Sequence, residues 1–389
     1  MTDPARRIGV NLLWLVPGVV GGSEEYTTRL LRGLAEEGPD DLHLTLFALA
    51  SFAEAHPDLV AHYPTVTVRL DGHNRSRRVG AEATWLARQA AVRNVELLHH
   101  AGGVVPPGPG IARLPAALTI HDLQPLVMPQ NFTPLKRRWL ARMIPRSAAR
   151  AAMVFTPSEP TSASVVERLG IPAARVRTVP HGIEPPAPVS ADRVAAARAR
   201  YHLAERVILY PAITYGHKDH VTLVRAFAKL ARPRPDLTLV LTGGEGPAEP
   251  AVAQAVRDSG VGDQVRRTGR IPASDLDALY AAATVVAVPS RFEGFGAPAL
   301  EAMAAGVPVV VADDTALPWV VGDAGLRVPV GNVERWSQAL GRVIDEPEVQ
   351  ATLAAAGSVR ARVFTWDRSS AALADGYRAA LAMGEDGSR

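Results

Sequence analysis

The sequence predicts an α/β protein of two domains, each built on a doubly wound parallel sheet. Its 389 residues suggest two domains, at about 150 residues per domain. Short apolar runs alternate with longer helical patterns through both halves, which is the pattern of βαβ units. Between the halves, residues 180–188 contain four prolines, too many for a helix or a central strand, so we interpret them as the domain linker.

The first half contains seven apolar runs of strand length, and amphipathic patterns predict helices at 23–36, 81–92 and 161–169. The first run follows Arg6 and Arg7 and imitates a secretory signal peptide, but Asn11 interrupts it and no small-residue cleavage site follows. We therefore interpret it as a buried strand and predict a cytoplasmic protein. The predicted strands are Arg7–Val16, Leu42–Ala48, Thr65–Leu70, Leu97–His99, Ala117–Ile120, Met153–Thr156 and Arg175–Val179.

The second half repeats the scheme, and a last helix follows Thr365, a candidate N-cap. Its predicted strands are Val207–Pro211, Leu237–Leu241, Val265–Thr268, Val285–Val288 and Val309–Ala312. Its predicted helices are at 221–230, 248–259, 275–282, 299–305, 333–345 and 348–362. We expect domains at 1–184 and 185–364 that face each other across a cleft, with a helix at 365–389 packing back towards the first. Ligands of such sheets bind beyond the carboxyl ends of the strands.

The composition excludes several classes of protein. The chain has no cysteine, which rules out a disulfide scaffold, a thiolate metal site and a cysteine nucleophile. Lys and Arg number 42 against 39 Asp and Glu, and a net charge of +3 does not predict nucleic-acid binding. No apolar run reaches the roughly 18 residues needed to span a membrane.

The stretch from Pro289 to Pro308 contains the most informative motif. It follows a predicted strand, and Gly294 and Gly296 leave backbone amides open to a ligand before a helix begins at Pro298. Such a turn binds anions through its amides and the helix dipole. Glu293 precedes the turn and Glu301 lies eight residues later, about 12 Å along a helix. Two acids so spaced could bind the sugar and the ribose of a nucleoside-diphosphate sugar.

A second candidate is Lys218, one of three lysines in the chain, which lies between a predicted strand and the helix at 221–230. A compact ammonium group suits a diphosphate in a narrow site. The alternative is an ordinary surface lysine on a loop. His121 follows another strand and could reach the same ligand region, although an isolated histidine is more often structural. Gly22 belongs to a glycine pair that opens a helix, where Ser23 could also serve as the N-cap.

This ordered set of motifs resembles retaining glycosyltransferase family 4, which has the GT-B fold. The resemblance covers nearly the whole chain and rests on the spaced acids and on six further segments. These are Gly21–Glu25, His121–Asp122, Ser158–Glu159, Pro180–Ile183, His217–His220 and the helix that follows Phe364. The resemblance implies a hexosyltransferase that uses front-face substitution, so we name no protein nucleophile. No cluster of histidines or acids has metal-binding spacing, so we predict a metal-independent reaction. It places a functional histidine at His121 and a diphosphate-binding lysine at Lys218.

From this resemblance we assign the candidate site. The catalytic residues are His121, Lys218 and Glu293, and no residue is assigned to a metal. The donor-binding residues are Gly22, His217, Lys218, Gly243, Arg270, Ile271, Glu293, Gly294, Phe295, Gly296, Leu300 and Glu301. Arg270 lies in a turn that the family places beside the nucleotide base.

The sequence departs from the family at one point, because residues 211–216 lack the arginine that many members have shortly before the lysine. His217 stands beside the lysine instead. The lysine motif is similar to that of bacterial mannosyl- and rhamnosyltransferases, so we favour GDP-mannose as donor, with a UDP-sugar or dTDP-sugar as alternatives. The expected acceptor is a hydroxyl group of a glycan, a lipid-linked glycan or a natural product.

Two other functions remain open: a sugar-nucleotide 2-epimerase, and a non-catalytic sugar-nucleotide-binding protein. Two further motifs are set aside. Asp275 and Asp277 imitate a metal-binding pair, but Ser274 and Asp277 fit a helix-capping box. The glycines at 243–246 lack dinucleotide-binding spacing.

Residues 134–146 predict a basic amphipathic helix. Arg138, Arg142 and Arg146 form one stripe, with Trp139, Leu140, Met143 and Ile144 on an apolar side. The segment Lys136–Arg146 could contact an anionic membrane at the inner face, or it could dock on its own domain with a solvated arginine face. The segment at 73–78 predicts a loop, either an acceptor contact or a solvated connection.

Overall fold

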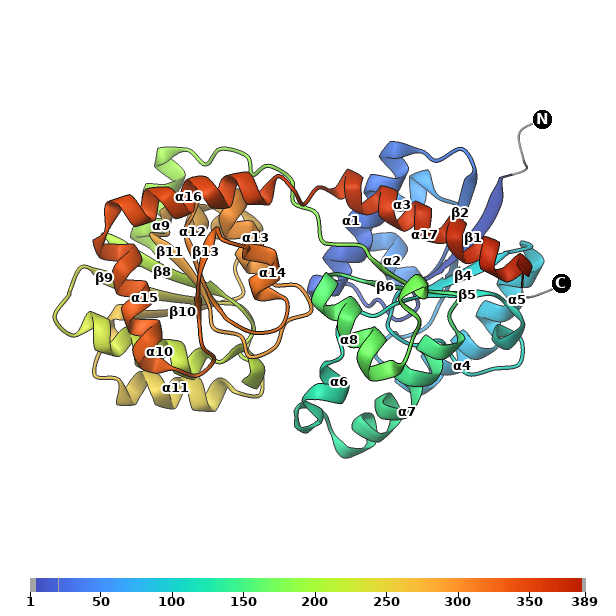
Figure 1. Ribbon diagram of the computed structural model, residues 1–389, viewed down its shortest axis with the longest axis horizontal. Helices are drawn as coiled ribbons and strands as arrows, with labels where there is room; N and C mark the ends of the chain where they lie inside the picture. Colours follow the sequence, from blue (N-terminus) through green and yellow to red (C-terminus); the bar gives the residue numbers. More distant parts are fainter. Residues whose placement is uncertain (1–4, 20, 387–389) are drawn as a thin grey trace. The chain divides into compact units, whose positions relative to one another are not determined.

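The computed structural model describes residues 5–19 and 21–386, which fold into two compact units (Figure 1). Unit 1 contains the chain up to Gly182 and again from Thr365, and unit 2 spans Ile183–Phe364. The boundary from the sequence analysis, after residue 184, lies two residues further along the chain. The residues around it, 179–190, form neither helix nor strand, as their prolines require.

Unit 1 contains a seven-stranded, all-parallel sheet in the order β3-β2-β1-β4-β5-β6-β7. The strand order reverses between β1 and β4, where Asn11 lies opposite His100. The strands are β1 (Arg6–Asn11), β2 (Leu42–Leu49), β3 (Thr65–Val68), β4 (Leu97–His100), β5 (Ala116–Thr119), β6 (Met153–Thr156) and β7 (Val176–Thr178).

Helices cover both faces of this sheet (Figure 1). One face packs against α1 and α17 through a core that includes Val10, Tyr26 and Tyr377. The other packs against α5 and α7 through Leu86, Ile144 and their neighbours. The helices of unit 1 are α1 (Gly22–Glu37), α2 (Ala50–Ala55), α3 (Pro57–His62), α4 (Arg75–Ala83), α5 (Trp85–Val92), α6 (Gln124–Val127), α7 (Pro134–Arg150), α8 (Glu159–Leu169) and α17 (Trp366–Asp386).

The last helix, α17, is an integral part of unit 1. The backbone N–H of Arg368 donates to Oγ1 of Thr365 at 3.3 Å, which confirms the predicted cap. A Cβ on Gly376 would lie 2.2 Å from the ring of Phe155, so only glycine lets the helix approach the sheet this closely. His99 then joins α17 to the sheet, with Nδ1 2.7 Å from the Tyr377 hydroxyl and Nε2 2.7 Å from Thr119 Oγ1.

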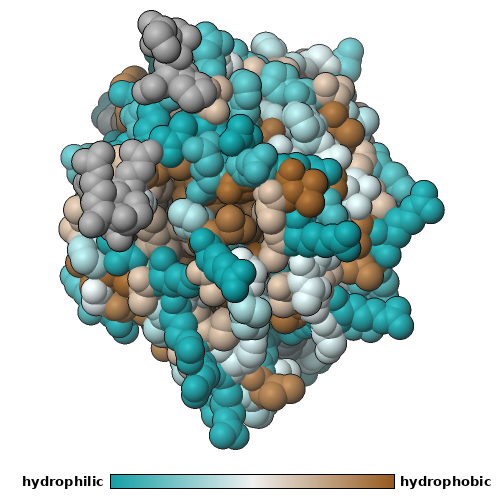
Figure 2. Space-filling model, turned by 90° about the vertical axis from the view of Figure 1, so that its right-hand side faces the viewer, coloured by the Kyte–Doolittle hydropathy of each residue, from teal (hydrophilic) through white to brown (hydrophobic). Residues whose placement is uncertain are grey.

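Hydrophobic residues are distributed in small groups on the face drawn in Figure 2, where brown residues lie between teal ones. This mixed pattern is that of an ordinary protein surface. Within the described ranges, no helix combines the length and the apolar character needed to cross a bilayer.

Unit 2 contains a six-stranded parallel sheet in the order β10-β9-β8-β11-β12-β13, which reverses between β8 and β11. Both sheets are therefore doubly wound, as predicted. Strand β13 was not predicted, because it contains a glycine and an exposed arginine. The strands are β8 (Arg206–Pro211), β9 (Leu237–Thr242), β10 (Val265–Gly269), β11 (Val285–Val288), β12 (Val309–Ala312) and β13 (Gly325–Val328).

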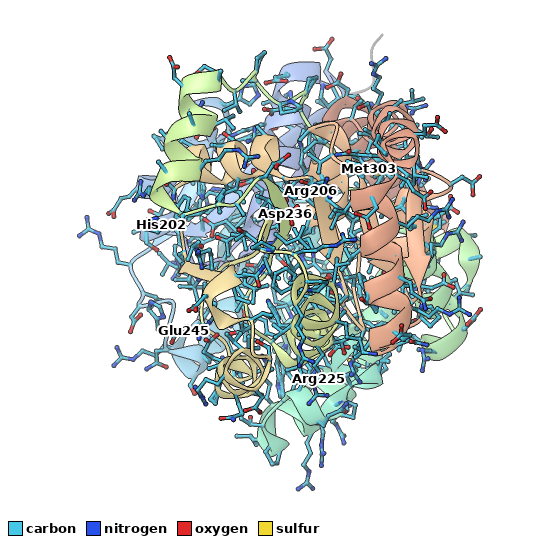
Figure 3. All side chains as sticks on the ribbon, turned by 90° about the vertical axis from the view of Figure 1, so that its left-hand side faces the viewer. His202, Arg206, Arg225, Asp236, Glu245 and Met303 are labelled. Atoms are coloured by element: carbon cyan, nitrogen blue, oxygen red, sulfur yellow. The ribbon has the colours of Figure 1, made fainter. Side chains whose placement is uncertain are left out.

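Ion pairs tie the amino edge of this sheet together. Arg206 begins β8 and pairs at 3.5 Å with Asp236, which precedes β9 (Figure 3). Arg234 pairs with Asp345 at 2.6 Å. Ligands bind at the carboxyl edge of such sheets, so these pairs have a structural role. The helices of unit 2 are α9 (Ala191–Arg200), α10 (His220–Ala231), α11 (Glu249–Asp258), α12 (Ala273–Ala282), α13 (Ala297–Ala304), α14 (Leu317–Val321), α15 (Val333–Asp345) and α16 (Pro347–Ala361).

Several local predictions were wrong. The first strand ends at Asn11, and the apolar residues 12–16 that follow form a loop in which all but Trp14 are buried. Ser23 lies inside α1, whose N-cap is Gly21. Ser274 does not cap α12, which begins after Pro272, and Asp275 instead accepts from the Tyr201 hydroxyl at 2.6 Å.

The segment expected to be a loop at 73–78 contains the first turn of α4. Asn74 starts this helix, because its Oδ1 accepts from the backbone N–H of Arg77 at 3.2 Å.

Candidate active site

Lys218 ends a single 3-10 turn, Gly216–Lys218, that follows β8 at the point where the strand order of unit 2 reverses. The buried Tyr210 hydroxyl donates to the backbone oxygen of Lys218 at 2.9 Å and lies 2.9 Å from Ser290 Oγ. Ser290 follows β11. This hydroxyl therefore holds the two strand-end segments of the site together.

Glu293 lies in the loop between β11 and α13. Its backbone N–H donates to Thr315 Oγ1 at 3.0 Å. The loop ends at Gly296, whose φ of +106° and approach to Leu317, 2.5 Å from a Cβ placed there, require glycine. Pro298 occupies the first turn of α13, as predicted.

The structure brings Lys218 and Glu293 into direct contact. Lys218 Nζ donates to Glu293 Oε1 at 2.6 Å, and their side chains are only 19% and 11% exposed. The two residues are 75 positions apart in the sequence. An ion pair held largely out of water fixes the orientation of both side chains beside the glycine loop.

Glu301 lies on α13 and accepts from the Tyr280 hydroxyl at 2.6 Å. Burial raises the pKa of Tyr280 well above its usual value, and the neighbouring Glu301 carboxylate raises it further. The phenol therefore stays protonated and holds one carboxylate oxygen of Glu301. Glu293 and Glu301 thus flank the glycine loop as the sequence analysis expected.

His217 does not replace the missing arginine as a charged group. Its ring stacks on Tyr215 with centroids 5.7 Å apart, and burial, followed by the Lys218 ammonium, lowers the pKa of His217 to about 4. It is therefore neutral near pH 7. Arg291, which was not predicted, also lies here: its backbone N–H donates to the His217 carbonyl oxygen at 2.7 Å, and its Nε lies 3.0 Å from Asp219 Oδ2. Arg291 lies two residues before Glu293 in the sequence, and this proximity could have indicated that it belongs to the site.

A cavity of about 300 Å³ opens at the carboxyl ends of β8, β9 and β10. Gly243 and Gly269 line it, and Gly243 has a φ of +135°. Thr214 Oγ1 donates to Glu249 Oε2 at 2.8 Å, and Arg267 forms an ion pair with the same carboxylate. Neither Glu249 nor Arg267 was predicted as a site residue. Glu245, on the loop between β9 and α11, lines the exposed rim (Figure 3).

The remaining predicted donor residues of unit 2 differ in exposure. Arg270 is exposed beside Gly244, and Ile271 packs partly on the unit core. Phe295 and Leu300 are 3% and 1% exposed. Their side chains belong to the hydrophobic core, so they can shape the site without presenting a surface to a ligand.

His121 and Gly22 belong to unit 1. His121 Nε2 lies 2.9 Å from the Ala101 carbonyl oxygen, which can only accept, so Nε2 carries the proton and Nδ1 is an acceptor. Burial lowers the pKa of His121 to about 4. Gly22 begins α1, with nothing within 4 Å of a Cβ placed there, so its backbone is open to close approach.

The described part of the chain contains no group of three or more His, Asp or Glu side chains arranged to hold a metal ion. Asp275, half of the pair that imitates a metal motif, forms an ion pair with Arg200 at 3.0 Å.

Two family-level sequence profiles together match most of the chain. The profile described as Glycosyltransferase Family 4 matches residues 20–185, and the profile described as Glycosyl transferases group 1 matches residues 198–360. The chain is 30% identical over 400 residues to D-inositol 3-phosphate glycosyltransferase of Salinispora tropica, covering 94% of this chain and 82% of the relative. It is 29% identical over 266 residues to O-antigen chain mannosyltransferase B of Escherichia coli, covering 68% and 70%.

Solved structures share this fold. A sucrose-phosphate synthase from Thermosynechococcus elongatus matches with a TM-score of 0.76 at 22% identity, covering 97% of this chain and 99% of that one. Anabaena HepE in complex with UDP and glucose matches with a TM-score of 0.74 at 19% identity, covering 95% and 98%.

Proposed function

The chain belongs to glycosyltransferase family 4, and on this premise we propose that it transfers a hexosyl group from a nucleotide-diphospho-sugar to a hydroxyl acceptor. We propose further that transfer retains the anomeric configuration and needs no metal ion. The observation that carries the proposal is the contact between Lys218 Nζ and Glu293 Oε1 at 2.6 Å, beside the glycine loop that begins α13.

Each charged group has a role in this proposal. The diphosphate would take the place of Glu293 as the partner of Lys218, with the amides of the glycine loop binding its oxygens. Glu293 would then accept hydrogen bonds from the sugar hydroxyls. Glu301, held by the Tyr280 hydroxyl at 2.6 Å, would accept from the ribose.

In the proposed reaction the bond from the sugar C1 to the diphosphate oxygen breaks, and its electron pair stays on the leaving diphosphate. The acceptor oxygen bonds to C1 on the same face, and the acceptor proton passes to the diphosphate. Lys218 stabilises the charge that develops on the leaving group, which is the main electrostatic contribution. His121, with Nδ1 as acceptor, is assigned to a hydroxyl of the donor sugar.

GDP-mannose is the proposed donor, and the similarity to a mannosyltransferase supports it. We expect GDP to raise the Tm more than UDP, dTDP or ADP in a thermal-shift panel, because a ligand at 100 times its Kd adds about 2.7 kcal/mol to the free energy of unfolding. A larger shift with UDP or dTDP would overturn the choice of guanosine, and no shift with any nucleotide would contradict the proposed donor site.

Helix α7 supports a second part of the proposal, contact with an anionic lipid surface at the inner membrane face. Arg138, Arg142 and Arg146 are exposed, as expected. Ile144 is buried on one side of the helix, but Trp139 is not. It is 41% exposed, and Leu135 is 82% exposed. Apolar side chains among arginines suit the interface of an anionic bilayer.

We expect the protein to float with vesicles containing phosphatidylglycerol and not with pure phosphatidylcholine. Three arginines near the surface supply about 3 kcal/mol, at about 1 kcal/mol each. The double variant Leu135→Glu, Trp139→Glu should lose binding at least tenfold. Val92→Glu changes an apolar residue on α5 that is 69% exposed and serves as the control. Equal flotation of both variants would argue against the assignment.

A further inference from the structure

Two loops that pack closely together form one wall of the cavity in unit 2. A Cβ on Gly243, after β9, would lie 2.5 Å from the backbone oxygen of Ala212, after β8. A Cβ on Gly246 would lie 2.7 Å from the backbone oxygen of Thr214. Only glycine permits backbones to approach this closely. The backbone N–H of Thr214 also donates to the Gly244 oxygen at 3.2 Å, so this wall of the cavity is preformed.

The same wall orients a carboxylate that lines the cavity. Glu249 is the first residue of α11, and its side chain is 15% exposed. The Thr214 hydroxyl accepts from the backbone N–H of Gly246 at 2.7 Å, so its own proton points to Glu249 Oε2, 2.8 Å away. Arg267, on the edge strand β10, pairs with the other oxygen, Oε1, and its side chain is 37% exposed. The carboxylate is therefore more buried than the guanidinium beside it.

The size and charge of the cavity restrict its ligand. A volume of about 300 Å³ is at the lower end for ligand pockets and suits a single ring system. Two carboxylates, Glu245 and Glu249, line the cavity with one guanidinium, Arg267, and this excess of negative charge disfavours a phosphate. The pair of Glu249 and Arg267 offers oxygen acceptors followed by N–H donors. An uncharged ring with adjacent donors beside adjacent acceptors complements this order.

Among the common nucleobases, guanine has this order of groups along one edge. Its N2 amino group and N1–H donate, and its O6 and N7 accept. Glu249 can accept from the two donors, and Arg267 can donate to the two acceptors. Uracil and thymine have a single N–H between two carbonyl groups, and adenine and cytosine have an amino group beside an unprotonated ring nitrogen. In each of these bases a lone pair would face the carboxylate.

We propose that this cavity binds the guanine base of the donor, and that Glu249 and Arg267 select guanine over the other bases. The inference rests on the proposed transfer from a sugar nucleotide and names the residues that choose its base. Thr214 lies four residues before Lys218, so their Cα atoms are at most about 14 Å apart. A nucleoside diphosphate can span this distance, with its base in the cavity and its phosphates at Lys218.

Saturation-transfer NMR on the full chain, with guanosine, inosine and uridine as probes, tests the cavity without a phosphate group. Inosine lacks only the 2-amino group of guanosine, so we expect it to bind about fivefold more weakly or worse, and uridine more weakly still. Glu249→Gln keeps an acceptor for the Thr214 hydroxyl but replaces one carboxylate oxygen with an amide N–H₂. This variant should weaken guanosine binding by a similar factor and remove its advantage over inosine.

A second variant tests the other half of the pair. Arg267→Met removes the donors to O6 and N7, which guanosine and inosine share, so it should weaken both nucleosides equally and keep the preference for guanosine. Glu346→Gln is the control, because Glu346 also pairs with an arginine of unit 2, Arg342, at 3.5 Å and does not line the cavity. It should leave the binding of all three nucleosides unchanged.

These measurements separate the possible outcomes. The inference would be overturned by equal binding of guanosine and inosine to the wild-type protein, by absence of guanosine binding, or by an unchanged preference in Glu249→Gln. Should Glu249→Gln fail to fold, the wild-type comparison and Arg267→Met decide. Selective guanosine binding without a thermal shift by GDP would contradict the proposed donor site and support the guanine cavity. A thermal shift by GDP without selectivity for guanosine would do the reverse.

Discussion

Replacing Lys218 with alanine is expected to reduce turnover by about 10²–10³-fold, the effect of removing one preorganised electrostatic group from the transition state. The Lys218 ammonium group lies 2.6 Å from Glu293. In the proposed reaction it stabilises the negative charge that develops on the leaving diphosphate. Glu293→Ala should lower turnover by a similar factor, because in the proposed reaction the carboxylate orients both the lysine and the donor sugar. The measurement is the rate of nucleotide release from the sugar nucleotide.

The chain offers a matched control for this experiment. Lys229 lies in unit 2 on α10 and also pairs with a glutamate, Glu334, but both side chains are more than half exposed. Lys229→Ala should leave turnover unchanged, because an exposed ion pair contributes about 0–1 kcal/mol. Near-wild-type nucleotide release by both Lys218→Ala and Glu293→Ala would refute the assignment of the site.

Much of the fold could be predicted because buried parallel strands are short, continuous apolar runs. Residues 309–312, four hydrophobic residues in a row, form β12 with the predicted bounds. The same rule failed where a buried apolar segment is not a strand, or where a strand is not continuously apolar. Residues 12–16 are apolar and all but Trp14 are buried, yet they form a loop. Strand β13 contains Gly325 and the exposed Arg327 and was missed.

The candidate site could be predicted only as far as its local motifs. Glu293, Gly296 and Glu301 lie within nine positions, so their spacing already indicates a shared site. Contacts that depend on the tertiary fold were not accessible. Tyr280 holds Glu301 across 21 positions, and Arg291 reaches Asp219 across 72. Sequence periodicity does not predict such pairs, because they form only when the fold brings distant segments together.

The stability of unit 1 is expected to fall steeply between pH 7 and pH 5. Burial lowers the pKa of His99, His100 and His181 to about 3 and that of His121 to about 4, against about 6.5 in an unfolded chain. In this window the unfolded chain binds more protons than the folded one, so the free energy of unfolding decreases as the pH falls.

Each of these histidines contributes about 1.4 kcal/mol at one pH unit below 6.5, so lowering the pH from 7.5 to 5.5 should destabilise unit 1 by about 5 kcal/mol. Unit 2 should lose about half as much, because two of its histidines, His217 and His220, have a lowered pKa, about 4 in each case. Glu82 acts in the opposite direction, since burial raises the pKa of its carboxyl group. Urea unfolding followed by tryptophan fluorescence at the two pH values measures the difference.

A single substitution tests the cause of this acid sensitivity. His181 packs against Tyr26 with ring centroids 4.5 Å apart, and His181→Phe keeps an aromatic ring there while removing one titrating group. The variant should reduce the loss of stability in unit 1 by about a quarter. His62 is exposed at the end of α3, so His62→Phe should leave the pH dependence as it is in wild type. Equal stability of the wild-type protein at pH 7.5 and 5.5 would contradict this prediction. It would mean that the buried imidazoles take up protons in the folded protein as readily as in the unfolded chain.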